Sequence, residues 1–182
     1  QPESDKFTNT SCVFLSSGEK IAQYDKIHLF DVDIADAQGR YRESDMFLSG
    51  DQIKVFPTPY GNVGLTICYD LRFPYLFDRL RKAGADIISV VAAFTEATGR
   101  AHWQPLLQAR GIEQQCYILG SNQWGQHDSK RRTFGHSMVV SPWGEILDEQ
   151  PEGSGIACAE IDLEEVKRIR REMPIANHQR DI

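Results

Sequence analysis

The sequence has few cysteines and no long hydrophobic run, and both absences exclude classes of protein. The cysteines at positions 12, 68, 116 and 158 include no C-x-x-C pair, so neither a zinc ribbon nor a thioredoxin-like redox site is predicted. Their wide spacing argues against a dense disulfide framework, and a reducing, cytoplasmic setting is expected. No apolar run approaches the roughly 20 residues that span a bilayer. The polar N-terminus lacks the apolar core of a signal peptide. We therefore expect no membrane partner.

Positive charge is also scarce. The net charge is −6, so a nucleic-acid backbone is not an expected partner. The one concentrated basic run, Lys130-Arg131-Arg132, is too short to form a groove that follows phosphates. It is either a solvated charge run or a patch that attracts a carboxylate substrate. The 182 residues, 41% of them hydrophobic, fit a single domain over residues 1–182.

Strands and helices alternate along the chain, which predicts an α/β layered fold with a mixed sheet. Residues 31–52 are polar, and we expect them to form a long surface loop of the kind that is often functional. The expected strands are 12–15, 20–24, 55–56, 63–67, 85–91, 116–120, 137–140, 145–147 and 156–161. The expected helices start at Pro74, cover 102–115, and cover 163–172 after an Asp162 cap.

One thiol stands where an apolar strand ends and a helix begins. The stretch is Gly64-Leu65-Thr66-Ile67-Cys68-Tyr69-Asp70-Leu71-Arg72-Phe73-Pro74. The carboxyl ends of strands form the ligand crevice of α/β sheets. A thiol there can act as a nucleophile, and the amide groups of the turn can face a developing oxyanion. The alternative is a buried structural cysteine, because free cysteine is among the most buried residue types.

Two charged residues, Lys26 and Glu43, complete a possible chemical set with Cys68. An ammonium group near a thiol favours the thiolate, and it also stabilises the oxyanion that forms when a thiolate attacks an amide. A carboxylate can orient that ammonium group and handle the proton of the departing amine. Taken singly, Lys26 and Glu43 also fit solvated surface residues.

Residues that follow two later strands are candidate substrate contacts. Phe94, Thr95 and Glu96 follow one strand, where the alternative is a simple loop cap. Asn122-Gln123-Trp124 follows the next strand, where the alternative is a polar turn with a packed tryptophan. Beside Cys68, Asp70 and Arg72 are expected to form a structural ion pair.

Several of these stretches together resemble the nitrilase superfamily of carbon–nitrogen hydrolases, and within it the Nit branch of amidases. The resemblance runs from residue 11 onward. It is carried by residues 26–32, 67–74, 101–113 and 135–144, which read KIHLFDV, ICYDLRFP, AHWQPLLQARGIE and GHSMVVSPWG.

This resemblance implies a four-layer αββα sandwich that forms homodimers and uses no metal or organic cofactor. Cys68 would be the nucleophile and would form a thioester while ammonia or an amine leaves. Lys26 and the backbone N–H of Tyr69 would face the oxyanion, and Glu43 would lie near the lysine and the leaving group. The implied reaction is hydrolysis of a small amide that carries a carboxylate. Phe94, Thr95 and Asn122 are the candidate substrate contacts.

The chain departs from the family pattern at its start. The family's first glutamate, a general base, lies well before the lysine, but only Glu3 and Glu19 precede Lys26, and neither has the expected setting. We therefore expect a chain that matches the C-terminal two-thirds of a family member and lacks the N-terminal segment. The alternatives are a nitrilase, an N-carbamoyl amidase, or a catalytically incomplete fragment that acts as a binding or assembly module.

Overall fold

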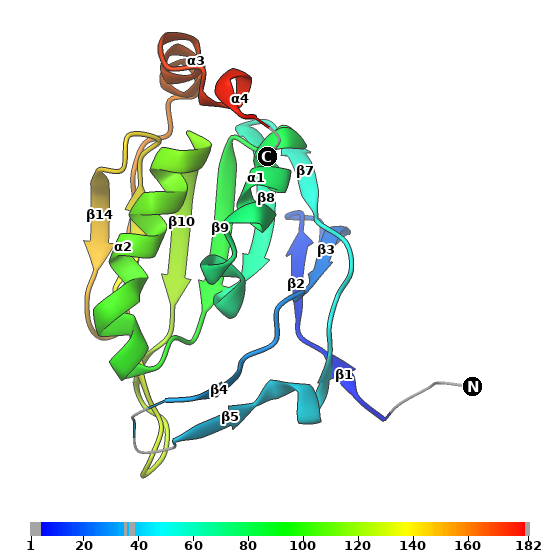
Figure 1. Ribbon diagram of the computed structural model, residues 1–182, viewed down its shortest axis with the longest axis vertical. Helices are drawn as coiled ribbons and strands as arrows, with labels where there is room; N and C mark the ends of the chain where they lie inside the picture. The colour runs from blue at the N-terminus through cyan, green and yellow to red at the C-terminus, as the bar shows by residue number, and fades with distance from the viewer. Residues whose placement is uncertain (1–4, 35, 37–38, 181–182) are drawn as a thin grey trace.

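The computed structural model describes residues 5–34, 36 and 39–180, which are organised around one six-stranded sheet (Figure 1). Its strands are β7 Val55–Thr58, β8 Gly61–Ile67, β9 Ile87–Ala92, β10 Tyr117–Asn122, β13 Ser137–Val140 and β14 Ile146–Gln150. They lie in the order β14-β13-β10-β9-β8-β7. The central strands β8, β9 and β10 run parallel, and the outer pairs are antiparallel. The predicted α/β fold with a mixed sheet is confirmed.

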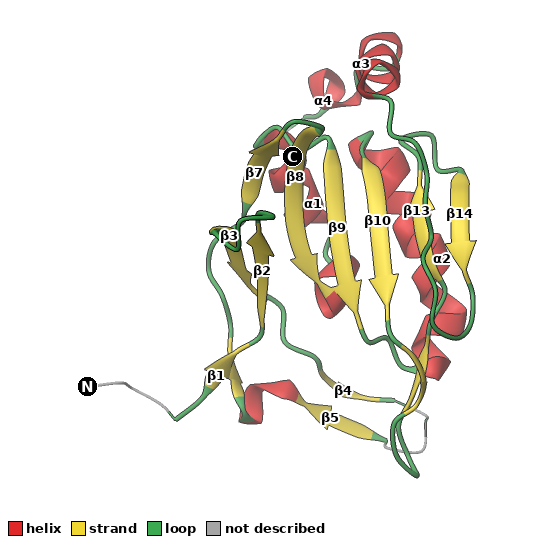
Figure 2. Ribbon diagram, turned by 180° about the vertical axis from the view of Figure 1, so that it is seen from behind, coloured by secondary structure: helices red, strands yellow, loops and turns green. Residues whose placement is uncertain are grey.

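Two helices cover one face of this sheet. They are α1 Pro74–Lys82 and α2 Glu96–Gln114, and each connects two parallel strands. Figure 2, seen from behind, places the sheet in front of both helices. Proline at the first position of α1 starts the helix without the loss of a hydrogen bond. The described residues thus form one sheet layer and one helix layer. The four-layer sandwich that the family resemblance implies is not confirmed by them.

The main core lies between the two helices and the sheet. Buried side chains of α1 and α2 pack on the strands, and these are Leu76, Phe77, Leu80, Trp103 and Leu107. Gly120 in β10 allows this close approach. A Cβ atom there would lie 2.6 Å from Leu107 Cδ1 and 3.0 Å from Trp103 Cζ2. The core therefore fixes the carboxyl ends of the parallel strands, where the site is expected.

Smaller elements surround this frame. They are β1 Phe7–Thr8, β2 Thr10–Phe14, β3 Lys20–Asp25, β4 Asp31–Asp33, β5 Arg40–Arg42, β6 Phe47–Leu48, β11 Trp124–Gln126, β12 Arg132–Phe134, α3 Leu163–Glu172 and α4 Ile175–His178, with 3-10 turns at Glu43–Asp45 and Cys68–Arg72. The hairpins β2–β3, β4–β5 and β11–β12 are antiparallel. In Figure 2, β4 and β5 cross below the end of the sheet at which β8, β9 and β10 finish, and α3 and α4 lie at the opposite end.

The structure corrects three expectations about local structure. Residues 31–52 are not one loop, because they contain β4, β5, a 3-10 turn and β6. Residues 156–161 form no strand, since no ladder pairs with them in the described part of the chain. Helix α2 begins at Glu96 rather than His102 because Thr95 caps it, accepting the N–H of Thr98 at 3.3 Å. The hairpin at 20–24 and the Asp162 cap of α3 are confirmed.

No helix among the described residues is long and apolar enough to cross a bilayer.

Candidate active site

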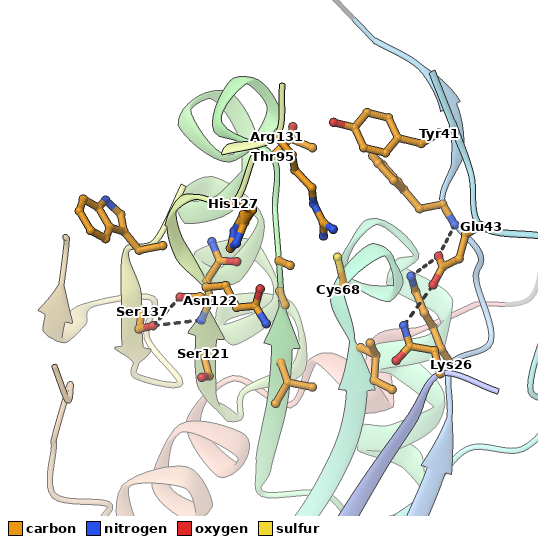
Figure 3. A pocket seen from close by; sticks show the side chains of 18 of the residues that line it. Lys26, Tyr41, Glu43, Cys68, Thr95, Ser121, Asn122, His127, Arg131 and Ser137 are labelled. Atoms are coloured by element: carbon orange, nitrogen blue, oxygen red, sulfur yellow. Dashed lines mark hydrogen bonds and ion pairs between the residues drawn. The ribbon is translucent and has the colours of Figure 1, made fainter. Parts of the chain in front are cut away.

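A cavity of about 1080 Å³ opens at the carboxyl ends of β8, β9 and β10. Each of these parallel strands delivers a predicted site residue to it, namely Cys68, Thr95 and Asn122. The segment after β3 and the turn after β5 supply Lys26 and Glu43 on the other wall (Figure 3). The fold therefore brings the three predicted catalytic residues into one cavity, at the edge where α/β sheets bind ligands.

Cys68 has an unusual backbone conformation. Its φ angle of 51° lies in the left-handed region, which costs a residue with a side chain about 1–2 kcal/mol. The strain occurs at the abrupt change from β8 to the 3-10 turn, and it presents the thiol to the cavity (Figure 3). The backbone N–H of Ala93, just after β9, acts on the Cys68 thiol and lowers its pKa. A strained residue held between two strand ends is typical of a functional position.

Two opposing effects act on the pKa of Cys68. Burial raises the pKa of this thiol above its ordinary value, and the charge of Lys26 lowers it. The Ala93 N–H acts in the same direction as Lys26, whereas the carboxylates of Glu43 and Asp70 raise the pKa. Burial dominates, so the pKa is raised and the neutral thiol predominates at pH 7.

Lys26 and Glu43 form a largely buried ion pair on the cavity wall opposite the thiol. Lys26 is only 2% exposed, and its ammonium group donates to Glu43 Oε2. Glu43 also accepts the side-chain amide of Asn9 at 3.1 Å and the backbone N–H of Phe30 at 2.7 Å. A carboxylate with three donors is held in one orientation, and it holds the lysine in turn. Figure 3 shows these contacts on the wall that faces Cys68 across the cavity.

Asp70 belongs to the 3-10 turn that begins at Cys68, and it is completely buried. Its carboxylate accepts the Tyr24 hydroxyl at 2.7 Å, the Ile67 backbone N–H at 2.9 Å and the His28 backbone N–H at 3.1 Å. The His28 ring adds a fourth contact, at 2.7 Å from Nδ1. The expected ion pair between Asp70 and Arg72 is therefore wrong.

Arg72 lies on a different side of the turn. Its guanidinium lies 3.2 Å from His102 Nδ1 and over the rings of Tyr69 and Phe94. Arg72, Tyr69 and Phe94 line, together with Cys68, a second cavity of about 30 Å³. Phe94 lines only this smaller cavity, whereas Thr95 lines both. The turn that contains the Tyr69 backbone N–H borders the small cavity as well.

Asn122 lines the large cavity, and both ends of its side-chain amide make a hydrogen bond. Its oxygen accepts the Phe94 backbone N–H at 2.9 Å, and its nitrogen donates to the Gly135 carbonyl at 2.7 Å. This amide joins the loop after β9 to the loop before β13. Glu96 lies outside both cavities, since its carboxylate contacts Arg100 at 2.5 Å and Arg132 at 3.4 Å. Of the three candidate contacts that follow β9, Glu96 is therefore the one that borders neither cavity.

Several cavity residues had no signal in the sequence. Asn9 comes from the segment between β1 and β2, and Tyr41 comes from the region expected to be a loop. Ala93 acts on Cys68 through its backbone N–H, and every residue type except proline carries such a group, so the sequence gives no signal for it. Arg131 is the one member of the basic run that lines the cavity. No group of three or more potential metal ligands occurs among residues 5–34, 36 and 39–180. Glu3 lies outside the described residues.

Comparison with protein families decides the class of this fold and site. The model of the carbon-nitrogen hydrolase family matches residues 1–171. The chain belongs to the carbon-nitrogen hydrolase family. Among curated relatives, the deaminated glutathione amidases of Yersinia enterocolitica and Dictyostelium discoideum are 52% and 44% identical to it, each over 97% of this chain.

Solved structures support the same fold. The C. elegans NitFhit protein superposes with a TM-score of 0.90 at 44% identity, covering 96% of this chain and 42% of that one. Saccharomyces cerevisiae Nit3, a member of branch 10 of the nitrilase superfamily, has a TM-score of 0.83 at 34% identity, covering 96% and 60%. The nitrilase-like α/β fold is therefore confirmed. The chain spans 62% and 61% of the lengths of the two curated amidases.

Proposed function

We propose that this chain carries the catalytic centre of an amidase that hydrolyses a small, carboxylate-bearing amide. The arrangement of Cys68, Lys26 and Glu43 is the observation that carries the proposal. A strained thiol at the end of a parallel strand faces a buried ammonium–carboxylate pair across one cavity. Nucleophile, oxyanion stabiliser and proton-handling group are the parts that amide hydrolysis through a covalent intermediate needs.

The proposed reaction has two steps. In the first, the sulfur of Cys68 bonds to the amide carbon, and the charge on the carbonyl oxygen is stabilised by Lys26 and the Tyr69 backbone N–H. The C–N bond then breaks, the proton that the thiol gave up passes to the amine, and a thioester remains on Cys68. In the second, water attacks the thioester carbon, the C–S bond breaks, and the carboxylic acid and the thiol are released.

Glu43 is assigned to the lysine and the leaving group in this scheme. It is the one carboxylate that lines the cavity in the described part of the chain, and Lys26, Asn9 and Phe30 all donate to it. These donors fix its position. It therefore keeps Lys26 oriented and passes a proton to the departing amine. Because burial raises the pKa of Cys68, the first step also requires a base for the thiol proton.

The proposed substrate is deaminated glutathione, the compound named in the curated relatives at 52% and 44% identity. The carboxylates of that compound match the positive charge that Arg131 brings to the cavity. Phe94, Thr95 and Asn122 remain the proposed substrate contacts. We also propose a cytoplasmic location, a homodimeric assembly and a completed αββα sandwich for the working enzyme.

Product release from a panel of carboxylate-bearing amides tests the proposal. Cys68→Ala should abolish release of the amine, whereas Cys12→Ala, at an exposed thiol outside both cavities, should retain it. Nitriles and N-carbamoyl compounds in the same panel test the neighbouring chemistries. Equal release by the Cys68→Ala variant and the unmodified chain would contradict a cysteine mechanism, and no release by either would favour a binding module.

A further inference from the structure

The carbonyl group of Leu71 lies near the end of the 3-10 turn Cys68–Arg72, and Leu71 is completely buried. A 3-10 helix pairs each carbonyl with the N–H three residues later, so the last carbonyls of such a turn need other partners. For Leu71 the residue three positions later is Pro74, which has no N–H. Because a buried carbonyl without a donor is costly, this group requires a donor from another part of the chain.

Arg110 of α2 supplies two donors to this carbonyl. Its Nε atom donates to the Leu71 oxygen at 3.1 Å, and its Nη2 atom donates to the same oxygen at 2.9 Å. The residue is only 4% exposed, and its guanidinium lies over the Phe77 ring of α1, 5.4 Å from the ring centroid. Arg110 therefore lies where the turn that carries Cys68 meets both helices.

The ion pair of Arg110 does not explain why its guanidinium is buried. The Nη1 atom donates to Glu113 at 2.8 Å, and the Glu113 side chain is about half exposed. An exposed arginine could form the same pair within the helix, and burial of a charged group is unfavourable unless it gains further hydrogen bonds. What burial adds here is the double contact with the Leu71 carbonyl.

Two contacts enclose the strained residue Cys68, whose φ angle is 51°. On the side that precedes it, the Asp70 carboxylate holds the Ile67 backbone N–H at 2.9 Å. On the side that follows it, Arg110 holds the Leu71 carbonyl. A residue persists in a strained conformation only when the surrounding structure fixes it. The contact with Arg110 is therefore one of two that can keep the strain in place.

We infer that Arg110 is a positioning residue, which holds Cys68 in its left-handed conformation so that the thiol points into the cavity and faces Lys26 (Figure 3). The Tyr69 backbone N–H, which is assigned to the oxyanion, belongs to the same turn. The kinetic consequences of this inference rest on the proposed amidase function, whereas its effect on the thiol does not. Without the contact, the turn relaxes and only a fraction of the molecules presents the thiol to the cavity.

Kinetics with a carboxylate-bearing amide give the first test. Arg110→Met removes the donors and keeps most of the length of the side chain. We expect kcat to fall by roughly 5- to 30-fold, the factor that corresponds to the strain of a left-handed residue. KM should change little, because Arg110 lines neither cavity. Arg110→Lys keeps one charged donor and should recover part of kcat.

Two control variants separate this contact from the neighbouring charges. Glu113→Gln removes the ion pair of Arg110 and leaves the contact with Leu71 in place. Arg100→Met removes an exposed arginine of the same helix, which pairs with Glu96. Both controls should retain kcat.

A second experiment follows the thiol and does not depend on turnover. Alkylation of the Cys68 peptide by iodoacetamide is measured against pH by mass spectrometry, under conditions in which urea denaturation shows each variant to be fully folded. The charge of Lys26 acts on Cys68 when the thiol faces it. Lys26→Met should therefore move the midpoint of the pH profile less in the Arg110→Met background than in the unmodified chain, and a double-mutant cycle measures the difference. The Arg100→Met background should keep the full shift.

The outcomes separate this inference from the proposed function. Absence of turnover by the unmodified chain, together with a reduced Lys26 shift in Arg110→Met, would overturn the amidase proposal and keep the role of Arg110. A less stable but folded Arg110→Met variant with the full Lys26 shift would make Arg110 merely structural and would overturn the inference. An unchanged kcat in that variant of an active chain would overturn it too. If Arg110→Met does not fold, Arg110→Lys takes its place, and a full Lys26 shift there would overturn the inference.

Discussion

The buried carboxylate of Asp70 accepts the hydroxyl of Tyr24 at 2.7 Å, which ties strand β3 to the turn that carries Cys68. The same carboxylate accepts the Ile67 backbone N–H immediately before the strained residue. Lys26 follows Tyr24 by two residues, so one side chain connects the two halves of the proposed catalytic set. A satisfied buried polar network of this kind specifies a single local geometry.

Replacement of Asp70 should therefore affect both stability and the thiol. Asp70→Asn keeps the size of the side chain but turns one acceptor into a donor, which leaves buried groups unpaired. We expect the free energy of unfolding to fall by about 1–3 kcal/mol, measured by urea denaturation. Cys68 alkylation should also change in rate under conditions in which the variant is fully folded.

Tyr24→Phe is the matched control for Asp70, because it removes only the bond to β3 and leaves the Ile67 bond in place. It should have a smaller effect on stability than Asp70→Asn. If the two variants lower the free energy of unfolding equally, the hydrogen bond between Asp70 and the Ile67 N–H adds nothing to the stability of the turn.

The reactivity of Cys68 should depend strongly on pH. Burial raises the pKa of this thiol, so the thiolate fraction is small at pH 7 and grows as the pH rises past the ordinary range of a thiol. Alkylation of the Cys68 peptide should accordingly be slow at neutral pH and accelerate with a midpoint above the ordinary value of a thiol. A midpoint below that value would mean that Lys26 outweighs burial.

Removal of the lysine charge should move this midpoint further upward. Lys26 lowers the pKa of Cys68, so Lys26→Met removes a favourable interaction with the thiolate. The double variant Lys26→Met with Glu43→Gln separates this effect from that of the carboxylate left unpaired. It should show a smaller upward shift than Lys26→Met alone, because Glu43 raises the same pKa.

Glu43→Gln tests the part played by the carboxylate. The amide keeps one acceptor but has no charge to hold Lys26 and no proton to exchange with the amine. We expect amine release to fall by roughly 10²- to 10⁴-fold, the usual contribution of a positioned acid or base. Glu96→Gln provides the comparison, because Glu96 lies outside both cavities and pairs with Arg100. Similar losses in both variants would contradict a specific role of Glu43.

Much of the fold could be predicted from the sequence because the residues that start, cap or bury each element lie within that element or next to it. Pro74 starts α1, Asp162 caps α3, and the apolar runs of β8 to β10 are typical of strands covered by other elements. The start of α2 was missed because its first turn contains Gly99, a poor helix former. That glycine is required by packing, since a Cβ atom would lie 2.2 Å from Phe134 Cβ.

The candidate site was predicted less evenly. Cys68, Lys26 and Glu43 were found from residue chemistry and family resemblance, and the structure places them around one cavity. The Asp70 network could not be predicted, because its partners Tyr24 and His28 are more than 40 residues away in the chain. Nor could the basic run be resolved, since only the β11–β12 hairpin determines that Arg131 rather than its neighbours faces the cavity.

The covalent intermediate offers the most direct measurement of the central claim. The chain is mixed with a carboxylate-bearing amide, quenched in acid within one turnover, and digested for mass spectrometry. The account predicts that the peptide containing Cys68 gains the mass of the acyl group, that hydroxylamine removes it, and that the Cys12 and Cys158 peptides stay unmodified. Formation of the acid product with no acyl group on Cys68 at any time in the turnover would contradict the account.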